Sequence, residues 1–280
     1  MTTLDASGPN AAQIEYWNGE IGAAWAENQV RMDALLEPLT QPLLATLGDV
    51  RGRRVLDVGC GCGGTTLALA KAGANATGVD VSTPMLELAR RRAAVARLDA
   101  NFVLADASSH RFERRFDALF SRFGVMFFAD PVAAFANLRR ALETRGAVAY
   151  LCWQEVRANP WIAIPLAAAR PHLPEPPPMD PRAPGPFAFA DRDYVTDFMT
   201  RAGFVDVSID PLESTLSLGA SIDEALAFTV KMGPLSRSLA TVDTAVRERV
   251  VAAVRDALVP EAKGGAIALA ARCWLVKAIA

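Results

Sequence analysis

The chain has 280 residues, with 29 Lys and Arg against 31 Asp and Glu, which gives a formal net charge of −2. Hydrophobic residues make up 51% and charged residues 21%, a globular composition that excludes an intrinsically disordered chain. Without a basic surplus, the chain also lacks the charge that proteins use to bind the phosphates of nucleic acids.

The sequence predicts no targeting or membrane-spanning segment. The first residues have neither the basic run nor the apolar core of a secretory signal. The most apolar stretch, residues 266–280, contains Arg272 and Lys277 and is shorter than the roughly 20 residues of a spanning helix. The Cys60–Cys62 pair has no second Cys or His pair at metal-ligand spacing. We therefore expect a cytoplasmic protein with reduced thiols and no metal site.

Apolar residues at helical spacing predict helices over residues 1–50, which we interpret as an N-terminal helical lid. Residues 51–155 then alternate strand-like and helix-like segments. The predicted strands cover 55–58, 76–81, 101–105, 116–121 and 147–153, and the helices between them cover 65–72, 84–96 and 131–142. Alternation of this kind is typical of an α/β fold, a parallel sheet with helices on both faces.

The remaining residues are predicted to cap and complete this core. Eight of the 18 prolines lie between Pro171 and Pro186, so this segment is expected to be a loop or an extended lid within a cap insertion over 156–203. A helix is expected over 191–202, with Asp191 as its N-cap and Gly203 at its end. Residues 204–280 are expected to add strands at 204–209 and 266–276, with helices at 222–230 and 242–258 between them.

The most informative segment is Val55-Leu-Asp-Val-Gly-Cys-Gly-Cys-Gly-Gly64. A strand ends at Asp57, and the chain turns through glycines before a helix whose free N–H groups carry partial positive charge. Asp80 follows at the end of the second predicted strand, where a carboxylate can accept both hydroxyls of a ribose. The spacing of Gly59, Gly61 and Gly64 also satisfies the dinucleotide pattern G-x-G-x-x-G, so NAD(P) and other adenosine cofactors fit equally at this point.

Asp57 favours one of these cofactors. Its carboxylate faces the glycine loop, where it would repel a pyrophosphate and attract an ammonium group. S-adenosylmethionine (SAM) carries ribose hydroxyls, an ammonium group and a sulfonium. Together, Asp57 and Asp80 therefore point to SAM.

Several motifs in this order resemble the class I SAM-dependent methyltransferases. They are Asp57-x-Gly59-x-Gly61-x-Gly63, Gly78-Val-Asp80-Val-Ser82 with Pro84-Met85, Ala105-Asp106-Ala107, and Phe116-Asp117-Ala118-Leu119 leading into Ser121-Arg122-Phe123-Gly124. The resemblance is strong over residues 50–155 and weaker at Tyr16-Trp17-Asn18 and Ala202-Gly203-Phe204. It is greatest for the small-molecule branch that includes ubiquinone- and menaquinone-biosynthesis-type enzymes. The chain departs from that branch at Glu143-Thr-Arg-Gly146, where Pro-Gly-Gly is usual.

This resemblance implies a Rossmann-like, doubly wound and mostly parallel sheet of seven strands, and it implies roles for individual residues. Asp57 would orient the methionine amine, and Gly59, Gly61 and Gly63 would allow the backbone to approach the ligand. Asp80 would bind the ribose. The adenine would be contacted by Val81, Met85, Asp106 and Ala107, and the methionine part by backbone groups of Ser121 and Arg122.

Aromatic residues that converge on the crevice predict a hydrophobic or planar acceptor. They are Tyr16, Trp17, Trp25, Phe123 and Phe127, with Met126, Phe128, Phe187 and Phe189 as further candidates. His110 is a candidate general base and His172 a candidate for closing over the substrate, although a lone His is more often structural.

The leading hypothesis is thus a SAM-dependent methyltransferase that acts on a small molecule and has no nucleic-acid partner, with a homodimer left open. An NAD(P)-dependent oxidoreductase is the first alternative, but none of the three Tyr has a Lys four positions later. A SAM-binding protein without transferase activity is the second alternative, because a fold does not determine a function.

Overall fold

The computed structural model describes residues 4, 7–175 and 180–280. The chain forms two compact units. The first comprises Met1–Trp153, Pro181–Leu212 and Cys273–Ala280, and the second comprises Gln154–Asp180 and Glu213–Arg272. Residues 176–179 of the expected proline-rich lid lie outside the described residues.

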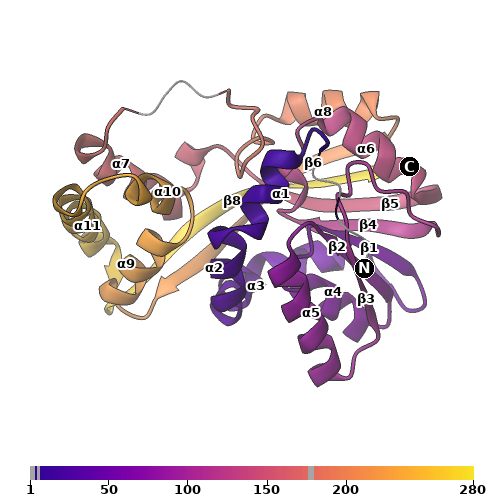
Figure 1. Ribbon diagram of the computed structural model, residues 1–280, viewed down its shortest axis with the longest axis horizontal. Coiled ribbons are helices and arrows are strands. Elements are labelled where there is room, and N and C mark those ends of the chain that lie inside the picture. The colour runs from indigo at the N-terminus through magenta and orange to yellow at the C-terminus, as the bar shows by residue number, and fades with distance from the viewer. Residues whose placement is uncertain (1–3, 5–6, 176–179) are drawn as a thin grey trace. The chain divides into compact units, whose positions relative to one another are not determined.

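Strands β1 to β5 of a twisted sheet form the centre of the first unit (Figure 1). The strands of this sheet follow the order β3-β2-β1-β4-β5-β8-β6, and a two-residue strand, β7 (Ala262–Lys263), pairs with β8. Strands β1 to β5 pair in parallel, and β8 is antiparallel to β5. This order confirms the predicted Rossmann-like sheet of seven mostly parallel strands. The strands are β1 (Arg54–Val58), β2 (Asn75–Asp80), β3 (Ala100–Leu104), β4 (Phe116–Arg122), β5 (Leu142–Trp153), β6 (Val205–Gly219) and β8 (Ala266–Ile279).

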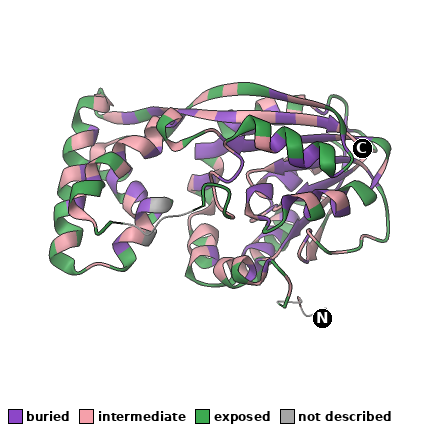
Figure 2. Cartoon of the chain, turned by 90° about the horizontal axis from the view of Figure 1, so that it is seen from above, coloured by how far each residue is buried: buried purple, intermediate pink, exposed green. Residues whose placement is uncertain are grey.

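Helices cover both faces of this sheet, as predicted. Figure 1 shows α6 and α8 on one face and α3, α4 and α5 on the other. Buried residues gather on the central strands between these layers (Figure 2). The helices of the first unit are α1 (Ala11–Asn18), α2 (Glu20–Glu27), α3 (Gln29–Ala45), α4 (Gly64–Lys71), α5 (Thr83–Ala96), α6 (Pro131–Arg140) and α8 (Arg192–Arg201).

Local sequence explains several of these boundaries. Helix α8 begins where the Asp191 carboxylate accepts hydrogen bonds from the backbone N–H groups of Asp193 and Tyr194, and it ends before Gly203, which has a φ of +92°. Because β1 to β4 are parallel, the loops after these strands lie along one edge of the sheet, where open α/β folds bind ligands.

Strand β5 begins at Leu142, five residues before the expected start at Ala147. The pairing with β4 shifts register between Phe116 and Ala118, and Arg145 adopts a left-handed φ of +64°. These features are those of a bulge, which accommodates the additional residues. The departure from the Pro-Gly-Gly pattern therefore lies within this irregular start of the strand.

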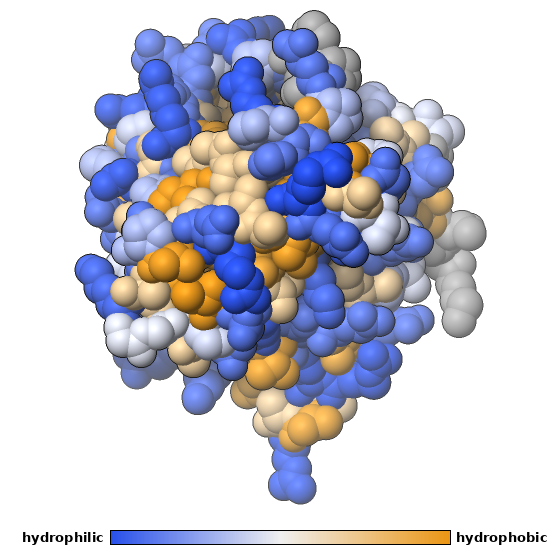
Figure 3. Space-filling view, turned by 90° about the vertical axis from the view of Figure 1, so that its left-hand side faces the viewer, coloured by the Kyte–Doolittle hydropathy of each residue, from blue (hydrophilic) through white to orange (hydrophobic). Residues whose placement is uncertain are grey.

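The second unit contains helices whose apolar faces pack together. Helix α7 packs against α11, and α9 packs against both α10 and α11. A small hollow in this unit is lined by Trp161, Ile162, Pro165, Leu166, Phe228, Thr229, Met232 and Leu235. Figure 3 faces the side of this unit and shows apolar residues among hydrophilic ones. The helices are η2 (Val156–Ala158), α7 (Pro160–Ala169), η3 (Arg170–His172), α9 (Ile222–Lys231), α10 (Pro234–Ala240), α11 (Thr244–Leu258) and η4 (Val259–Glu261).

Within the described ranges, no helix has both the length and the apolar character that crossing a membrane requires.

Candidate active site

The loops after β1 and β4 touch at two glycines. A Cβ on Gly59 would lie 2.5 Å from the Cα of Gly124, and the φ of Gly59 is +67°. A Cβ on Gly63 would lie 2.9 Å from the Cβ of Ala89. Gly59 and Gly63 are therefore needed where parts of the chain pass each other closely.

Gly61 has a different environment. Its φ is +53°, yet the nearest atom to a Cβ built there is the Sδ of Met85 at 3.7 Å, an ordinary contact. Its N–H donates a hydrogen bond of 2.8 Å to Asp80 Oδ2. Of these three glycines, Gly61 therefore leaves the most space beside its backbone, and its contact with a ligand stays a prediction.

Asp57 is fully buried beneath this loop. Its Oδ2 accepts hydrogen bonds from the hydroxyls of Thr65 and Thr66, each at 2.6 Å, while its Oδ1 has no partner among the described residues. Burial raises the pKa of the Asp57 carboxyl to about 6, against the lowering effect of the two hydroxyls and of Arg122. One oxygen therefore joins β1 to α4, and the other is buried without a donor from the described residues.

Asp80 ends β2 with only 8% of its surface exposed. Its Oδ1 accepts from the Ser82 N–H and its Oδ2 from the Gly61 N–H, both at 2.8 Å. Burial raises the pKa of this carboxyl. Each oxygen retains a lone pair for a further donor such as a ribose hydroxyl. Val81 is half-buried beside it, and Met85 is buried at the start of α5.

The N-terminal helices hold the loops around this carboxylate. Asn18, at the end of α1, donates to the Val81 carbonyl at 2.8 Å and accepts from the Thr83 N–H at 3.0 Å. The Ser82 hydroxyl donates to the Trp17 carbonyl at 2.7 Å.

A second N-terminal contact reaches the loop after β3. Asp106 accepts hydrogen bonds from Asn10 Nδ2 at 3.0 Å and from both the N–H and the hydroxyl of Ser108. Asn10 also accepts from the Ala129 N–H at 2.8 Å, so its side chain bridges the loops after β3 and β4. Ala107 is buried, and its carbonyl accepts from Asn137.

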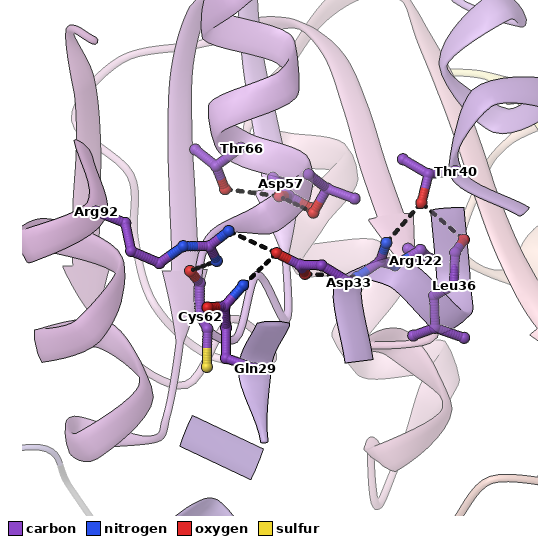
Figure 4. A network of polar contacts seen from close by, with 10 residues as sticks. Gln29, Asp33, Leu36, Thr40, Asp57, Cys62, Thr66, Arg92 and Arg122 are labelled. Atoms are coloured by element: carbon purple, nitrogen blue, oxygen red, sulfur yellow. Dashed lines mark hydrogen bonds and ion pairs between the residues drawn. The ribbon is translucent and has the colours of Figure 1, made fainter. Parts of the chain in front are cut away.

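Ser121 and Arg122 close β4. The Ser121 hydroxyl donates to the Val58 carbonyl at 2.7 Å and accepts from the Gly124 N–H at 3.1 Å, so it links β1 to the loop after β4. The Arg122 side chain is 13% exposed, and burial lowers the pKa of its guanidinium. Figure 4 shows this guanidinium between Asp33 and Thr40 of α3.

Four of the predicted substrate residues form one aromatic cluster. The Trp17 ring lies edge-to-face against Tyr16, Trp25 and Phe127, with ring centroids 5.2, 6.0 and 5.1 Å apart. All four side chains are half-buried. Trp17 links this cluster to the loop that follows β2, because its carbonyl accepts from the Ser82 hydroxyl.

The other aromatic candidates separate into two groups. Phe123 stacks on Trp153 with ring centroids 4.0 Å apart, and its φ is +66°. Phe128 and Phe189 instead pack against Phe135 in the buried core, where Met126 is also buried, and Phe187 is half-buried.

His110 lies in the loop after β3, where its backbone N–H donates to the Asp106 carbonyl at 2.9 Å. The His110 ring packs edge-on against Phe112, which packs against Phe116 at the amino-terminal start of β4. The carbonyl of His110 accepts from Asn137 in α6. His172 belongs to the second unit. The role proposed for His110 stays a prediction.

Sequence reasoning missed two groups of polar residues. Asn10, Asn18, Asp33 and Arg92 join the N-terminal helices to the core, and Thr65 and Thr66 join β1 to α4. Thr65 and Thr66 directly follow the glycine loop, so their position in the sequence could have indicated a contact with Asp57. The Asp33–Arg92 contact joins residues that are 59 positions apart, and no spacing rule indicates it.

The donors and acceptors at this edge of the sheet fit SAM. Gly61 leaves room for a ligand against the backbone, Asp80 offers carboxylate oxygens to hydroxyl groups, and the unpartnered Oδ1 of Asp57 suits an ammonium group.

Similarity to known proteins identifies the family to which this chain belongs. Residues 55–146 match the family described as a methyltransferase domain. An uncharacterized protein of Mycobacterium tuberculosis (strain ATCC 25618 / H37Rv) is 32% identical over 212 residues, which cover 73% of this chain and 74% of that protein. The ubiquinone biosynthesis O-methyltransferase of Shewanella pealeana is 40% identical over 70 residues, 25% of this chain and 30% of that enzyme.

Solved structures share the fold. The YcgJ protein of Bacillus subtilis aligns over 86% of this chain and 97% of its own, with a TM-score of 0.57 and 16% identity. The magnesium protoporphyrin IX methyltransferase of Synechocystis PCC 6803, solved with bound S-adenosylhomocysteine (SAH), aligns over 95% and 99%, with a TM-score of 0.53 and 14% identity. The match of residues 55–146 to a methyltransferase domain decides against the oxidoreductase alternative. The chain belongs to the class I SAM-dependent methyltransferases.

Proposed function

We propose that this methyltransferase acts on a small hydrophobic or aromatic acceptor. The observation that carries the proposal is the half-buried cluster of Tyr16, Trp17, Trp25 and Phe127 next to the loop after β2. Aromatic rings of this kind suit an apolar or planar ligand, because they offer large contact areas and prefer edge-to-face or offset contacts. The stacked pair of Phe123 and Trp153 supports the same acceptor class.

The cofactor site proposed for this reaction lies along the carboxyl ends of the strands. Asp80 would bind the ribose hydroxyls, Asp57 would orient the methionine amine, and the Gly61 backbone would lie against the ligand. The adenine would meet the side chains and backbone of Val81, Met85, Asp106 and Ala107, and the methionine part would meet backbone groups of Ser121 and Arg122.

When bound, SAM supplies a methyl group on a sulfonium, which is already a good leaving group. The task left to the protein is to align the acceptor with that methyl and to exclude water. Positioning alone can contribute on the order of 7–11 kcal/mol to lowering a reaction barrier. The aromatic cluster would align the acceptor and exclude water, because it presents apolar surface. That surface lies on the N-terminal helices and on the 3₁₀ turn after β4, η1 (Val125–Phe127).

A finer assignment is to the branch of ubiquinone- and menaquinone-biosynthesis-type enzymes. The motifs of residues 55–124 and the partial similarity to the Shewanella enzyme support it. We also retain the expectation of a cytoplasmic enzyme without a nucleic-acid partner.

The experiment that tests the acceptor class measures SAH formation with a panel of candidate acceptors: hydroxylated aromatic rings, short-chain acids, phosphorylated amines and RNA. Transfer to the aromatic members alone supports the proposal, and transfer to phosphorylated amines or RNA contradicts it. Trp17→Ala and Phe127→Ala should then raise the acceptor KM about tenfold, since each removes a large apolar contact. The matched control is Phe112→Ala, because Phe112 packs against Phe116 at the opposite edge of the sheet.

A general base is needed only if the acceptor atom carries a proton. His110→Ala should lower kcat and leave SAH binding unchanged if His110 takes that proton. An unchanged kcat removes His110 from the mechanism without affecting the acceptor proposal.

A further inference from the structure

Helix α3 places a carboxylate against the glycine loop. Asp33 Oδ1 lies so close to Gly64, the first residue of α4, that a Cβ there would be only 2.6 Å away. Arg92 of α5 donates to Asp33 Oδ2 at 2.5 Å, and Gln29 donates to the same oxygen. Figure 4 shows the carboxylate held between Arg92 and Arg122. An anion of this chain therefore sits where helix α4 begins, an environment that favours negative charge.

The Arg122 guanidinium is far from saturated. It has five N–H donors, and within the described part of the chain it makes one hydrogen bond, to Thr40 Oγ1 at 2.5 Å. Its contact with Asp33 Oδ1 is 4.0 Å long, which is an ion pair without a hydrogen bond. A guanidinium with so little exposed surface and so many unused donors is suited to a further acceptor, and a carboxylate matches its geometry best.

Arg92 connects this site to the loop itself. Its second hydrogen bond, also 2.5 Å long, goes to the carbonyl of Cys62, between Gly61 and Gly63. A carboxylate on Arg92 would therefore lie next to the same loop whose backbone is open at Gly61.

The charged side chains at this end of the site complement the two charged groups of an amino acid. The Oδ1 of Asp57 is buried and receives no hydrogen bond from the residues that the structure describes, and Arg122 is close enough to act electrostatically on both Asp57 and Asp33. The α-amino acid end of SAM presents an ammonium group next to a carboxylate. Asp57 offers a negative charge to the ammonium group, and Arg122 offers a positive charge to the carboxylate. The Asp33 carboxylate already lies beside Arg122.

The geometry points to Asp33 as an internal mimic of the SAM carboxylate. When the cofactor binds, its carboxylate replaces that of Asp33 on Arg92 and Arg122. The Asp33 side chain is 32% exposed, so it can turn to solvent while α3 stays in place. The exchange leaves the two guanidinium groups paired with one carboxylate before and after binding. Helix α3 thereby competes with the cofactor for one end of the site. The inference rests on the cofactor site proposed above.

The test compares two adenosine thioethers. SAH carries the amino acid group, whereas 5′-methylthioadenosine ends in a methyl group at the same sulfur. Calorimetric titration of both ligands gives a ratio of affinities that reports the amino acid end alone. Asp33→Asn removes the competing charge at constant shape and should tighten SAH about threefold to tenfold, with the affinity for 5′-methylthioadenosine unchanged.

Arg122→Met should act in the opposite direction. Loss of a charge-assisted contact should weaken SAH about tenfold or more and leave 5′-methylthioadenosine unchanged. Glu27→Gln is the matched control, because it removes the same charge from an exposed position at the end of α2. Its SAH affinity should stay within about twofold of the parent chain.

The outcomes are distinct. If Asp33→Asn leaves the SAH affinity unchanged or weakens it, Asp33 is a fixed structural contact and the inference is wrong. If Arg122→Met weakens both ligands equally, Arg122 shapes the site without binding the carboxylate, which also overturns it. If the parent chain binds neither ligand, the proposed cofactor site itself fails.

Discussion

The Thr65 hydroxyl donates a hydrogen bond of 2.6 Å to Asp57 Oδ2, which fastens the end of β1 to the first turn of α4. Thr66 donates to the same oxygen, while the opposite oxygen of the carboxylate is buried and has no partner in the described ranges. Burial outweighs these hydrogen bonds and raises the pKa of Asp57 to about 6.

This shift predicts how folding stability depends on pH. The folded pKa lies above the unfolded value of 3.8, so between these values the folded chain binds more protons than the unfolded chain. The contribution of Asp57 to the free energy of unfolding should therefore fall as pH rises from about 4 to about 7, by on the order of 2–3 kcal/mol.

Urea unfolding of the parent chain and of Asp57→Asn across this range isolates that contribution, because the other carboxyl groups titrate in both proteins. The difference in unfolding free energy, parent minus variant, should decrease with rising pH. A difference that stays flat or increases would mean that Asp57 is charged and well solvated in the folded chain.

Asp57 also shows what the sequence can and cannot predict. Its place at the end of a strand before a glycine turn followed from the pattern of residues 55–64, and the parallel sheet followed from the alternation of strands and helices. The carboxylate lies beneath the loop because α4 packs close to β1. The spacing of residues in the sequence does not indicate that packing. The same holds for Gly59, which the pattern assigned to a ligand and which packs against Gly124.

Phe123 should carry backbone strain. Its φ of +66° disfavours a residue with a Cβ, and the stack on Trp153 offsets that strain. Phe123→Ala loses the stack and keeps the strain, whereas Phe123→Gly loses both. The glycine variant should therefore be the more stable of the two by about 1 kcal/mol in urea unfolding.

The same pair of substitutions at Phe127 provides the control. Phe127 lies in a right-handed 3₁₀ turn, where glycine should be less stable than alanine by about 0.5–1 kcal/mol. If glycine is the less stable residue at both positions, Phe123 is not strained.

Tyr150 should tolerate loss of its hydroxyl. The side chain is completely buried in β5, and its hydroxyl has no hydrogen-bond partner in the described part of the chain. Leaving such a group unsatisfied costs about 1–3 kcal/mol, so Tyr150→Phe should unfold at the same or a higher urea concentration. Ser121→Ala is the contrasting case, because the Ser121 hydroxyl makes two hydrogen bonds, and its loss should destabilise the fold by about 1–3 kcal/mol. Clear destabilisation by Tyr150→Phe would reveal a partner for that hydroxyl.

Asn18 should couple the N-terminal lid to the cofactor. Its side chain bonds both the Val81 carbonyl and the Thr83 N–H, so it fixes the residues directly after Asp80. Asn18→Ala frees that loop, and the cofactor must then restrict it on binding, which should weaken SAH about threefold to tenfold.

Asn28→Ala is the appropriate comparison, because among the described residues the Asn28 side chain bonds only the Ala24 carbonyl, at 2.8 Å. Both variants lose one asparagine from the lid, but only Asn18 reaches the loop after β2. Calorimetric titration with SAH should therefore separate them, with Asn28→Ala within about twofold of the parent chain. If both variants weaken SAH binding equally, the N-terminal helices act through their general stability. If both bind SAH as tightly as the parent chain, the loop after β2 is already rigid without Asn18.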